Sequence, residues 1–506
     1  MATGPLSIVV HGGNSDTAAT QLVERFANRW SRGLGWDLEF VDDSPALMSC
    51  RLDHTLGDRY RVTTTLDCIE MVAGTLESLQ WALYTCEQMF PPEIFDDEFI
   101  GDIYEFMIPS LDIEDFPQFR WRGVHLDVAR HFYDVAQVAR FVDLLAMHKF
   151  NILHLHLSDD QGWRLEIPAW PKLTSVGSKR SSSPQGHESG GVDDGVVHQG
   201  YFSADDIASL VAYAQERFIT IVPEIDMPGH VQAALSAYPR FSNTKDHLAV
   251  ATRWGISRHI FNVDESTFSF AEDIVKYLTH IFPGPYVHIG GDECPVDEWE
   301  NSDRVTARMS DLNVSRVAEL QSVFTTRLHN VVVSSALADR GPLHETSRRA
   351  LAWDEVLDGE APRDLIIVAW RHSSEGARAA RLGHDVVMAP MQFTYFDWPQ
   401  STNPDEPVAL MQPPYPTSLE KVYKFKVIPP GLEDEFVPRI LGAQAQHWTE
   451  YIGTVAHLEY MAFPRLCAFS EVVWGSAGEF NEFHARLTRH VIRLAALGVN
   501  FRQLDR

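Results

Sequence analysis

The octet Tyr-Val-His-Ile-Gly-Gly-Asp-Glu occupies residues 286–293 of the chain. Its first four residues are typical of a short buried strand, and Gly290 and Gly291 then allow a close approach of the backbone to its surroundings. Asp292 and Glu293 follow where that strand would end. Taken alone, the octet fits a strand that runs into a solvated acidic turn as well as a strand that places two carboxylates in a functional site.

Seven other segments in the later part of the chain also resemble buried strands, and helical runs separate most of them. Together with 286–289, the expected strands are 123–128, 152–157, 220–225, 350–353, 365–370, 385–391 and 440–446. Helical spacing occurs, for example, at 135–148, 204–216, 268–281 and 314–330. Eight strands that alternate with helices predict an α/β fold of the (β/α)8 type, a TIM barrel.

The first part of the chain has a different pattern. A length of 506 residues exceeds one ordinary domain. Strand-like segments and amphipathic helical runs over 1–115 predict a smaller N-terminal α/β domain. The expected strands there are 6–10, 38–41 and 60–66, and the expected helices are 18–30 and 75–89. The texture changes at Phe116, so we expect the catalytic barrel to comprise 116–506.

The charge balance argues against two classes of partner. The net charge is −28, so the surface repels phosphate backbones and anionic lipid, and we expect neither a nucleic acid nor a membrane partner. No apolar stretch approaches the roughly 20 residues of a membrane span. A neutral or cationic substrate is easier to accept.

The cysteines and the N-terminus bear on the compartment. The five cysteines are scattered and odd in number, and therefore predict no disulfide framework. The apolar run Leu6 to Val10 has no basic region before it, which is not typical of a signal peptide. These two observations predict a cytoplasmic location, while the oligomeric state stays open.

Polar or aromatic side chains follow all eight expected strands. In a (β/α)8 barrel the active residues lie at the carboxyl ends of the strands. In chain order the strand ends carry Asp127 and Arg130, Asp159, Asp226 and His230, Asp292 and Glu293, Trp353, Trp370, Tyr395 and Asp397, and Trp448 and Glu450. Indole faces stack on C–H-rich sugar faces, and carboxylates and arginine hold hydroxyls. The sequence therefore predicts a sugar pocket.

Six motifs resemble, in the same order, those of glycoside hydrolase family 20, the β-N-acetylhexosaminidases. They are RGVHLDVARHF at 122–132, LHLSDDQGWR at 155–164, VPEIDMPGH at 222–230, HIGGDE at 288–293, WDE at 353–355 and WTE at 448–450. The resemblance covers the whole chain, with 1–115 similar to the small N-terminal domain of the family. It implies exo-hydrolysis of terminal β-linked N-acetylglucosamine, and also N-acetylgalactosamine, from glycans and oligosaccharides, without a cofactor or metal.

Asp292 and Glu293 are poor candidates for a facing pair of carboxylates. Retaining glycosidases hold two carboxyl groups about 5 Å apart across the scissile bond. Neighbours on a strand point to opposite sides, although this alternation can loosen after Gly-Gly. The substrate-assisted route fits better: Glu293 acts as general acid and then base, and the acetamide oxygen of the substrate attacks the anomeric carbon. Asp292 then stabilises the oxazolinium-like intermediate.

The roles of the remaining pocket residues are implied by the resemblance. Tyr395 would aim the acetamide oxygen, and Arg130 would grip the 3- and 4-hydroxyls. Asp397 and Glu450 would accept the outer hydroxyls. The walls around the acetamide methyl and the sugar face would be Trp353, Trp370 and Trp448.

A second set of residues is expected behind the catalytic acid. Asp159 and His230 would orient Glu293 and tune its proton affinity, with Asp226 behind His230. Asp354 and Glu355 belong to the matching motifs, but we assign them no contact with substrate. Many relatives also carry a further Trp in the loop after the Tyr-x-Asp of the seventh strand. Trp398 directly follows Asp397 and no other Trp occurs before Trp448, so the leaving-group side is not predicted.

Two other functions fit parts of the sequence. His154 and His156 face the same way on one strand, which would suit a metal-dependent hydrolase. A divalent site needs three or four converging ligands, and at the strand ends only His230 could join them. A non-catalytic glycan-binding protein would have lost its acid, whereas Glu293 is present.

Overall fold

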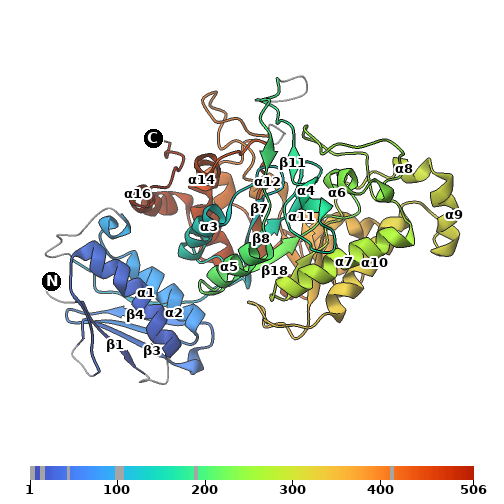
Figure 1. Ribbon diagram of the computed structural model, residues 1–506. Coiled ribbons are helices and arrows are strands. Elements are labelled where there is room, and N and C mark those ends of the chain that lie inside the picture. The colour runs from blue at the N-terminus through green and yellow to red at the C-terminus, as the bar shows by residue number, and fades with distance from the viewer. Residues whose placement is uncertain are drawn as a thin grey trace. The chain divides into compact units, whose positions relative to one another are not determined.

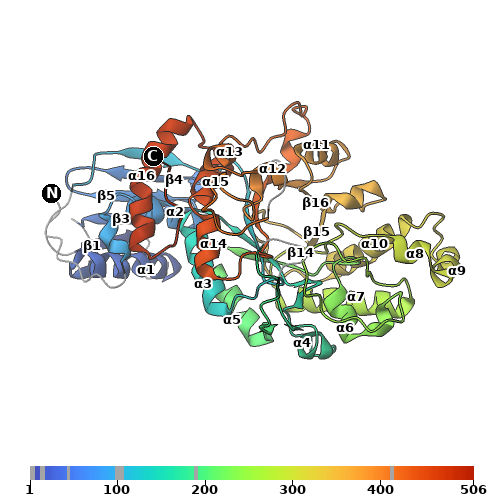
Figure 2. The same ribbon diagram turned by 90° about the horizontal axis from the view of Figure 1, so that it is seen from above.

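The computed structural model describes residues 6–11, 17–42, 46–96, 107–186, 192–410 and 415–505. The chain divides into two compact units, one formed by 1–118 with 474–506 and the other by 119–473 (Figures 1 and 2). The sequence prediction placed everything after 115 in the barrel. The structure corrects this boundary, because 474–506 group with the first unit. Trp474 explains the grouping: its Nε1 donates to Asp115 at 2.9 Å, and its ring meets Trp81 edge-on at 5.1 Å.

The first unit is an α/β sheet domain, as expected. Its six strands follow the order β2-β1-β3-β5-β4-β6. They are β1 (Leu6–His11), β2 (Leu38–Phe40), β3 (Met48–Leu52), β4 (Tyr60–Thr64), β5 (Ile69–Ala73) and β6 (Asp112–Asp115). The long helices are α1 (Thr17–Leu34), α2 (Leu76–Glu87) and α16 (Phe480–Ala496). The sequence prediction found β1, β2, β4, α1 and α2 but missed β3, β5 and β6.

The second unit is a closed barrel of eight parallel strands, so the predicted fold is confirmed. The strands are β7 (Trp121–Asp127), β8 (Ile152–His156), β13 (Thr220–Glu224), β14 (Tyr286–His288), β15 (Arg349–Trp353), β16 (Ile366–Ala369), β17 (Val386–Met388) and β18 (Ile440–His447). Each coincides with a predicted strand apart from small shifts at the ends. β18 pairs with β7 and closes the barrel.

Helices surround these strands (Figures 1 and 2). The longer ones are α3 (Val135–Met147), α5 (Ala204–Gln215), α7 (Glu265–Ile281), α9 (Asp303–Asp311), α10 (Glu319–Ser334), α11 (Ser373–Arg381), α14 (Val455–Ala462) and α15 (Arg465–Trp474). Short elements fill the loops: β9 (Ser158–Asp159), β10 (Gly162–Trp163), α4 (Lys172–Ser175), β11 (Lys179–Arg180), β12 (His198–Gln199), α6 (Gln232–Ala237), α8 (Asp297–Glu300), α12 (Met391–Thr394) and α13 (Leu419–Tyr423). Within the described ranges, none of the helices combines the length and apolar character needed to cross a lipid bilayer.

Local sequence explains where the first barrel helices begin. Asp134 accepts a hydrogen bond from the backbone N–H of Gln137 at the start of α3, and Ser203 does the same for Asp206 at the start of α5. In both helices the side chain of the third residue accepts a hydrogen bond from the backbone N–H of the capping residue, which completes a capping box. Such boxes satisfy backbone donors that the first turn leaves open.

The barrel interior changes character along its axis. Near the amino ends of the strands it is apolar, with Trp121, Ile152, Val222 and Tyr286 fully buried. Toward the carboxyl ends the interior side chains are polar yet equally buried: His125, His154, His156, Glu224, His288, Gln444 and Gln446. The amino ends supply the stabilising core, and the polar layer lies where barrels of this class carry their sites.

Candidate active site

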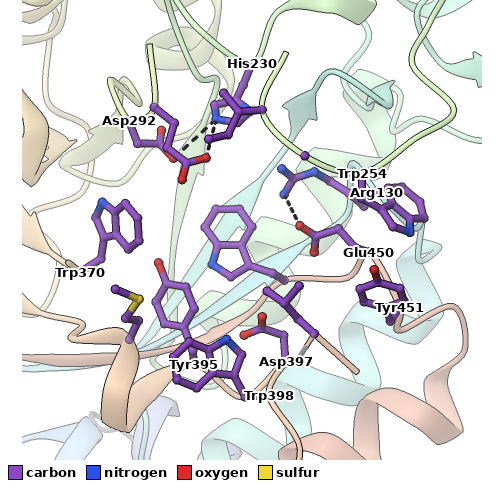
Figure 3. A pocket seen from close by; sticks show the side chains of 16 residues that line it. Arg130, His230, Trp254, Asp292, Trp370, Tyr395, Asp397, Trp398, Glu450 and Tyr451 are labelled. Carbon is purple, nitrogen blue, oxygen red and sulfur yellow. Dashed lines mark ion pairs between the residues drawn. The ribbon is translucent and has the colours of Figure 1, made fainter. Parts of the chain in front are cut away.

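A cavity of about 340 Å³ opens at the carboxyl ends of the barrel strands (Figure 3). Nine of the predicted site residues line it: Arg130, His230, Asp292, Glu293, Trp370, Tyr395, Asp397, Trp448 and Glu450. Asp159 and Asp226 lie behind this surface, as expected for supporting residues. Trp353 differs from its predicted place in the wall, because it is buried beneath Trp448, with the ring centres 5.9 Å apart.

The turn after β14 places both acids on the same side of the cavity. The backbone of Gly290, Gly291 and Glu293 has positive φ angles of 71°, 100° and 41°. A Cβ on Gly290 would lie 1.8 Å from Oδ1 of Asp226, so only glycine fits there. Positive φ is uncommon for a residue such as Glu293, and such backbone strain clusters at functional sites.

Strand alternation does not separate the two carboxylates, because β14 ends at His288. Nε2 of His230 lies 3.9 Å from Oδ2 of Asp292 and 3.6 Å from Oε2 of Glu293. Both acids thus share one imidazole. The sequence argument rested on strand alternation but allowed it to loosen after Gly-Gly, and the positive φ angles of Gly290 and Gly291 show that regular alternation has ended there.

Asp159 joins His230 to the polar layer of the barrel. Its Oδ1 lies 3.3 Å from Nδ1 of His230, and its Oδ2 lies 2.9 Å from both His156 Nε2 and Arg130 Nη2. Burial opposes ionisation of Asp159, but the charges of Arg130 and His230 outweigh it and hold its pKa well below the usual range. Burial also disfavours a charged His230, yet the charge of Asp159 raises the pKa of that imidazole well above its usual value.

Arg130 is fixed on several sides. It donates to Gln161 at 2.9 Å and to Asp127 at 3.2 Å, and Nη1 lies 3.8 Å from Glu450. Its guanidinium also lies over the ring of Trp448 at 5.2 Å. The guanidinium is therefore held in place before any ligand arrives.

The acids in and behind the opposite part of the cavity form no ion pair with an arginine or lysine among the described residues, and the imidazole of His230 lies 3.9 Å from Asp292. Burial raises the pKa of Asp226 to about 7. Burial, followed by the charge of Asp226, raises the pKa of Asp292 well above its usual range. Asp226 is held by the backbone N–H of Gly291 at 2.8 Å.

Tyr395 presents its hydroxyl to this acidic region. Its ring stacks near Trp370, with the centroids 6.0 Å apart and the planes 23° from parallel. The side chain of Trp448 hydrogen-bonds the phenol oxygen, and since indole N–H can only donate, the phenol keeps its own proton for another acceptor. Figure 3 shows the hydroxyl directed into the cavity, on the side of Trp370 and Asp292.

Several buried acceptors at the cavity have no partner. Both carboxylate oxygens of Asp397 and Oδ1 of Asp292 lack a hydrogen bond among the described residues. Buried acceptors of this kind are costly unless a ligand or water satisfies them. The hydroxyl and N–H donors of an amino sugar are the ligand groups that suit them.

Sequence reasoning missed part of the lining. The additional residues are Trp254, Gly255, Ile256, Met391, Leu410 and Tyr451, together with Trp398, whose place was left open. Tyr451 directly follows a recognised motif and could have been suspected. Trp254 and Ile256 belong to an irregular stretch, where no periodicity reveals which side chains turn inward.

His154 and His156 do not reach the cavity. Together with His288 they converge on Glu224 inside the barrel, with a distance of 2.5 Å from His156 Nδ1 to Oε2 and 2.9 Å from His288 Nδ1 to Oε1. The metal-dependent alternative therefore loses the two histidines on which it rested.

The barrel and its sugar-suited cavity define a glycoside hydrolase. The sequence model of the protein family "Glycosyl hydrolase family 20, catalytic domain" matches residues 119–477 of this chain. A beta-hexosaminidase of Vibrio furnissii is 32% identical over 470 residues, which are 90% of this chain and 71% of that protein. A beta-hexosaminidase of Porphyromonas gingivalis is 34% identical over 437 residues, covering 86% of this chain, and this chain spans 53% of that relative.

Solved structures agree with this match. The GH20 exo β-N-acetylglucosaminidase of Vibrio harveyi in complex with N-acetylglucosamine has a TM-score of 0.83 and 28% identity, over 99% of this chain and 75% of that one. The GH20 β-N-acetylhexosaminidase of Streptomyces coelicolor has a TM-score of 0.81 and 26% identity, over 100% and 96% of the two chains. The chain therefore belongs to glycoside hydrolase family 20, the β-N-acetylhexosaminidases.

Proposed function

We propose that the chain is a retaining exo-β-N-acetylhexosaminidase that works through an oxazolinium intermediate. It removes terminal, non-reducing β-linked N-acetylglucosamine, and also N-acetylgalactosamine, from glycans and oligosaccharides. The observation that carries this proposal is the shared position of Asp292 and Glu293 beside one imidazole. Two acids on one turn, both beside the same imidazole, are poorly placed on opposite sides of a sugar as acid and nucleophile, and this favours a nucleophile from the substrate.

Glu293 is the general acid of the first step. Its side chain is 34% exposed at the cavity, so it can reach the glycosidic oxygen. The acetamide oxygen bonds to the anomeric carbon, the glycosidic bond breaks, and the leaving oxygen takes the Glu293 proton. In the second step Glu293 removes a proton from water as the water attacks the anomeric carbon and opens the oxazolinium ring. Two inversions retain the configuration.

Asp292 and Tyr395 serve the acetamide. The phenol proton of Tyr395 binds the acetamide oxygen and aims it at the anomeric carbon. Asp292 accepts the acetamide N–H. Its raised pKa reflects burial beside Asp226, and positive charge on the oxazolinium favours the ionised carboxylate in return.

The other end of the sugar binds to groups that are already in place. Arg130 donates to the 3- and 4-hydroxyls, and the unpaired oxygens of Asp397 accept from the outer hydroxyls together with Glu450. Trp448 lies under this region and offers its face to the sugar ring, with Trp353 supporting it from below.

One comparison of substrates tests the proposal. We expect hydrolysis of a chromogenic β-N-acetylglucosaminide and no measurable hydrolysis of the matching β-glucoside, which lacks the acetamide. A thiazoline mimic of the cyclised intermediate should inhibit strongly. Equal rates on the two glycosides, or a trapped covalent sugar–protein adduct, would show that the protein supplies the nucleophile.

A further inference from the structure

We propose that Glu355 is a positioning residue that fixes the indole of Trp370 and so limits the size of the N-acyl group that the cavity accepts. The inference rests on the proposed function and on the expectation from the sequence that Trp370, which lines the cavity, is a wall around the acetamide methyl. Glu355 itself does not line the cavity. It acts on the substrate through the indole of Trp370, which lines the cavity.

The geometry around Trp370 carries the proposal. The indole Nε1 donates to the carboxyl of Glu355, at 2.9 Å from Oε2 and 3.1 Å from Oε1. The backbone N–H of the same tryptophan donates to Oδ2 of Asp354 at 2.8 Å. Two consecutive residues at the end of β15 thus hold both the main chain and the side chain of the residue after β16.

The surroundings of Glu355 keep its carboxyl neutral. The charged groups that face it are Asp292, Asp354 and Arg371. Arg371 forms an ion pair with Asp354 and another with Asp358 at 3.0 Å, so its charge is already engaged. Burial, then the negative charge of Asp292 and Asp354, raises the pKa of Glu355 to about 9.

A neutral carboxyl suits this position. It accepts from the indole without adding a second negative charge beside Asp292. Glutamine has the same shape and the same acceptor, so it is a close mimic of the protonated acid. Leucine has a similar volume but no acceptor, and it leaves the indole N–H to find another partner by moving.

The consequence is a change in substrate selectivity. A well-formed apolar pocket discriminates one extra methylene by roughly 10- to 200-fold. A wall that is free to move loses this discrimination, because the larger acyl group can displace it. Loss of Glu355 should therefore affect bulky acyl groups differently from acetyl.

The test compares aryl β-glycosides of glucosamine that carry N-acetyl or N-butanoyl groups. The wild-type ratio of kcat/KM should favour acetyl by roughly tenfold or more, and Glu355→Leu should reduce that preference to about twofold. Glu355→Gln should keep the wild-type ratio. Glu360→Leu, a change of an exposed glutamate a few residues later, is the matched control and should leave the ratio unchanged.

A double-mutant cycle shows whether the effect passes through Trp370. In a Trp370→Phe background the indole N–H is absent, so Glu355→Leu should add no further change in the acyl ratio. If Glu355→Leu does not fold, Glu355→Asp withdraws the acceptor by one methylene and should relax the ratio in the same direction.

Two results would overturn the inference. One is an unchanged acyl ratio in a folded Glu355→Leu or Glu355→Asp protein. The other is a change in the acyl ratio on Glu355→Leu that is equally large in the wild-type and in the Trp370→Phe background. Both presuppose a wild-type enzyme that requires the N-acyl group. A wild-type enzyme that cleaves plain glucosides equally well refutes the proposed function instead.

Discussion

The two ends of the cavity use the same residue types but treat charge in opposite ways. Around Arg130, three carboxylates lie within 4 Å of one guanidinium, at 3.2, 2.9 and 3.8 Å. Around Asp292, the structure describes no arginine or lysine in an ion pair with Asp226, Asp292 or Glu355, and burial raises the pKa of each. One end is compensated by an arginine, whereas the cation described beside Asp292 at the other end is the imidazole of His230 at 3.9 Å.

This difference matches the course of the proposed reaction. Hydroxyl groups stay neutral throughout, so they need fixed hydrogen-bond partners, and ion pairs provide that rigidity. Positive charge develops at the anomeric centre and on the acetamide, where acids that form no ion pair with an arginine or lysine can respond to it. The predictions below follow from this division, from the largest expected effect to the smallest.

Glu293→Gln should have the largest effect on turnover. Loss of general acid catalysis should lower kcat by about 10²- to 10⁴-fold on a substrate with a poor leaving group. A dinitrophenyl glycoside needs little protonation, so its loss should be much smaller. Comparison of kcat for the two leaving groups measures this, and a similar rate for wild type and variant on the poor leaving group would refute the acid assignment.

Asp292→Asn tests the uncompensated end. Asparagine keeps the size of the side chain but cannot balance the developing positive charge, so kcat should fall by about 10²- to 10³-fold with little change in KM. Thiazoline binding should weaken in parallel, because the inhibitor mimics the cyclised intermediate. A rise in KM with unchanged kcat would instead mean that Asp292 only binds substrate.

Arg130→Gln tests the compensated end, and there we expect a cost in stability as well as in binding. The change leaves Asp127, Asp159 and Glu450 without their shared cation, which should lower the free energy of unfolding by about 3–5 kcal/mol. KM should rise, since the 3- and 4-hydroxyls lose a donor. Urea denaturation measures the first effect, with Arg253→Gln, which breaks an exposed pair with Asp193, as the control.

The sequence located the residues at both ends of the cavity, but it did not show which carboxylates are paired with an arginine. Strand periodicity and strand-end chemistry located all eight barrel strands and nine residues of the cavity wall. Charge states depend on distances between segments far apart in the chain, such as Arg130 to Asp159 or Glu355 to Trp370, and no local pattern encodes them. For the same reason, the sequence did not show that 474–506 belong with the first unit.

The position of Trp353 has a related explanation. Its motif predicts a tryptophan at a strand end, but whether that indole reaches the cavity depends on the residues above it. Nε1 of Trp353 donates to Glu224 at 2.8 Å within the polar layer, whereas Nε1 of Trp370 donates to Glu355. Trp353 is therefore a buried support, whereas Trp370 forms part of the cavity wall.

The smallest effect concerns the pH dependence of stability, measured on Glu355→Gln. In the folded protein the pKa of Glu355 is about 9, above its ordinary value of 4.5. Its contribution to stability is therefore complete below about pH 4.5 and is lost as the pH rises toward 9. His156, with a pKa raised to about 10 by the charge of Glu224 against the effect of burial, adds a similar alkaline loss in wild type and variant.

Glutamine cannot ionise, so Glu355→Gln should remove the contribution of Glu355 to the loss of stability at high pH and leave the contribution of His156. Between about pH 5 and pH 9 the melting temperature should fall by a few degrees less in the variant than in wild type. Thermal unfolding at several pH values measures the difference, with Glu360→Gln as the exposed control. Parallel curves for Glu355→Gln and wild type would mean that Glu355 ionises normally, and the acetamide end of the cavity would then carry more charge than its burial suggests.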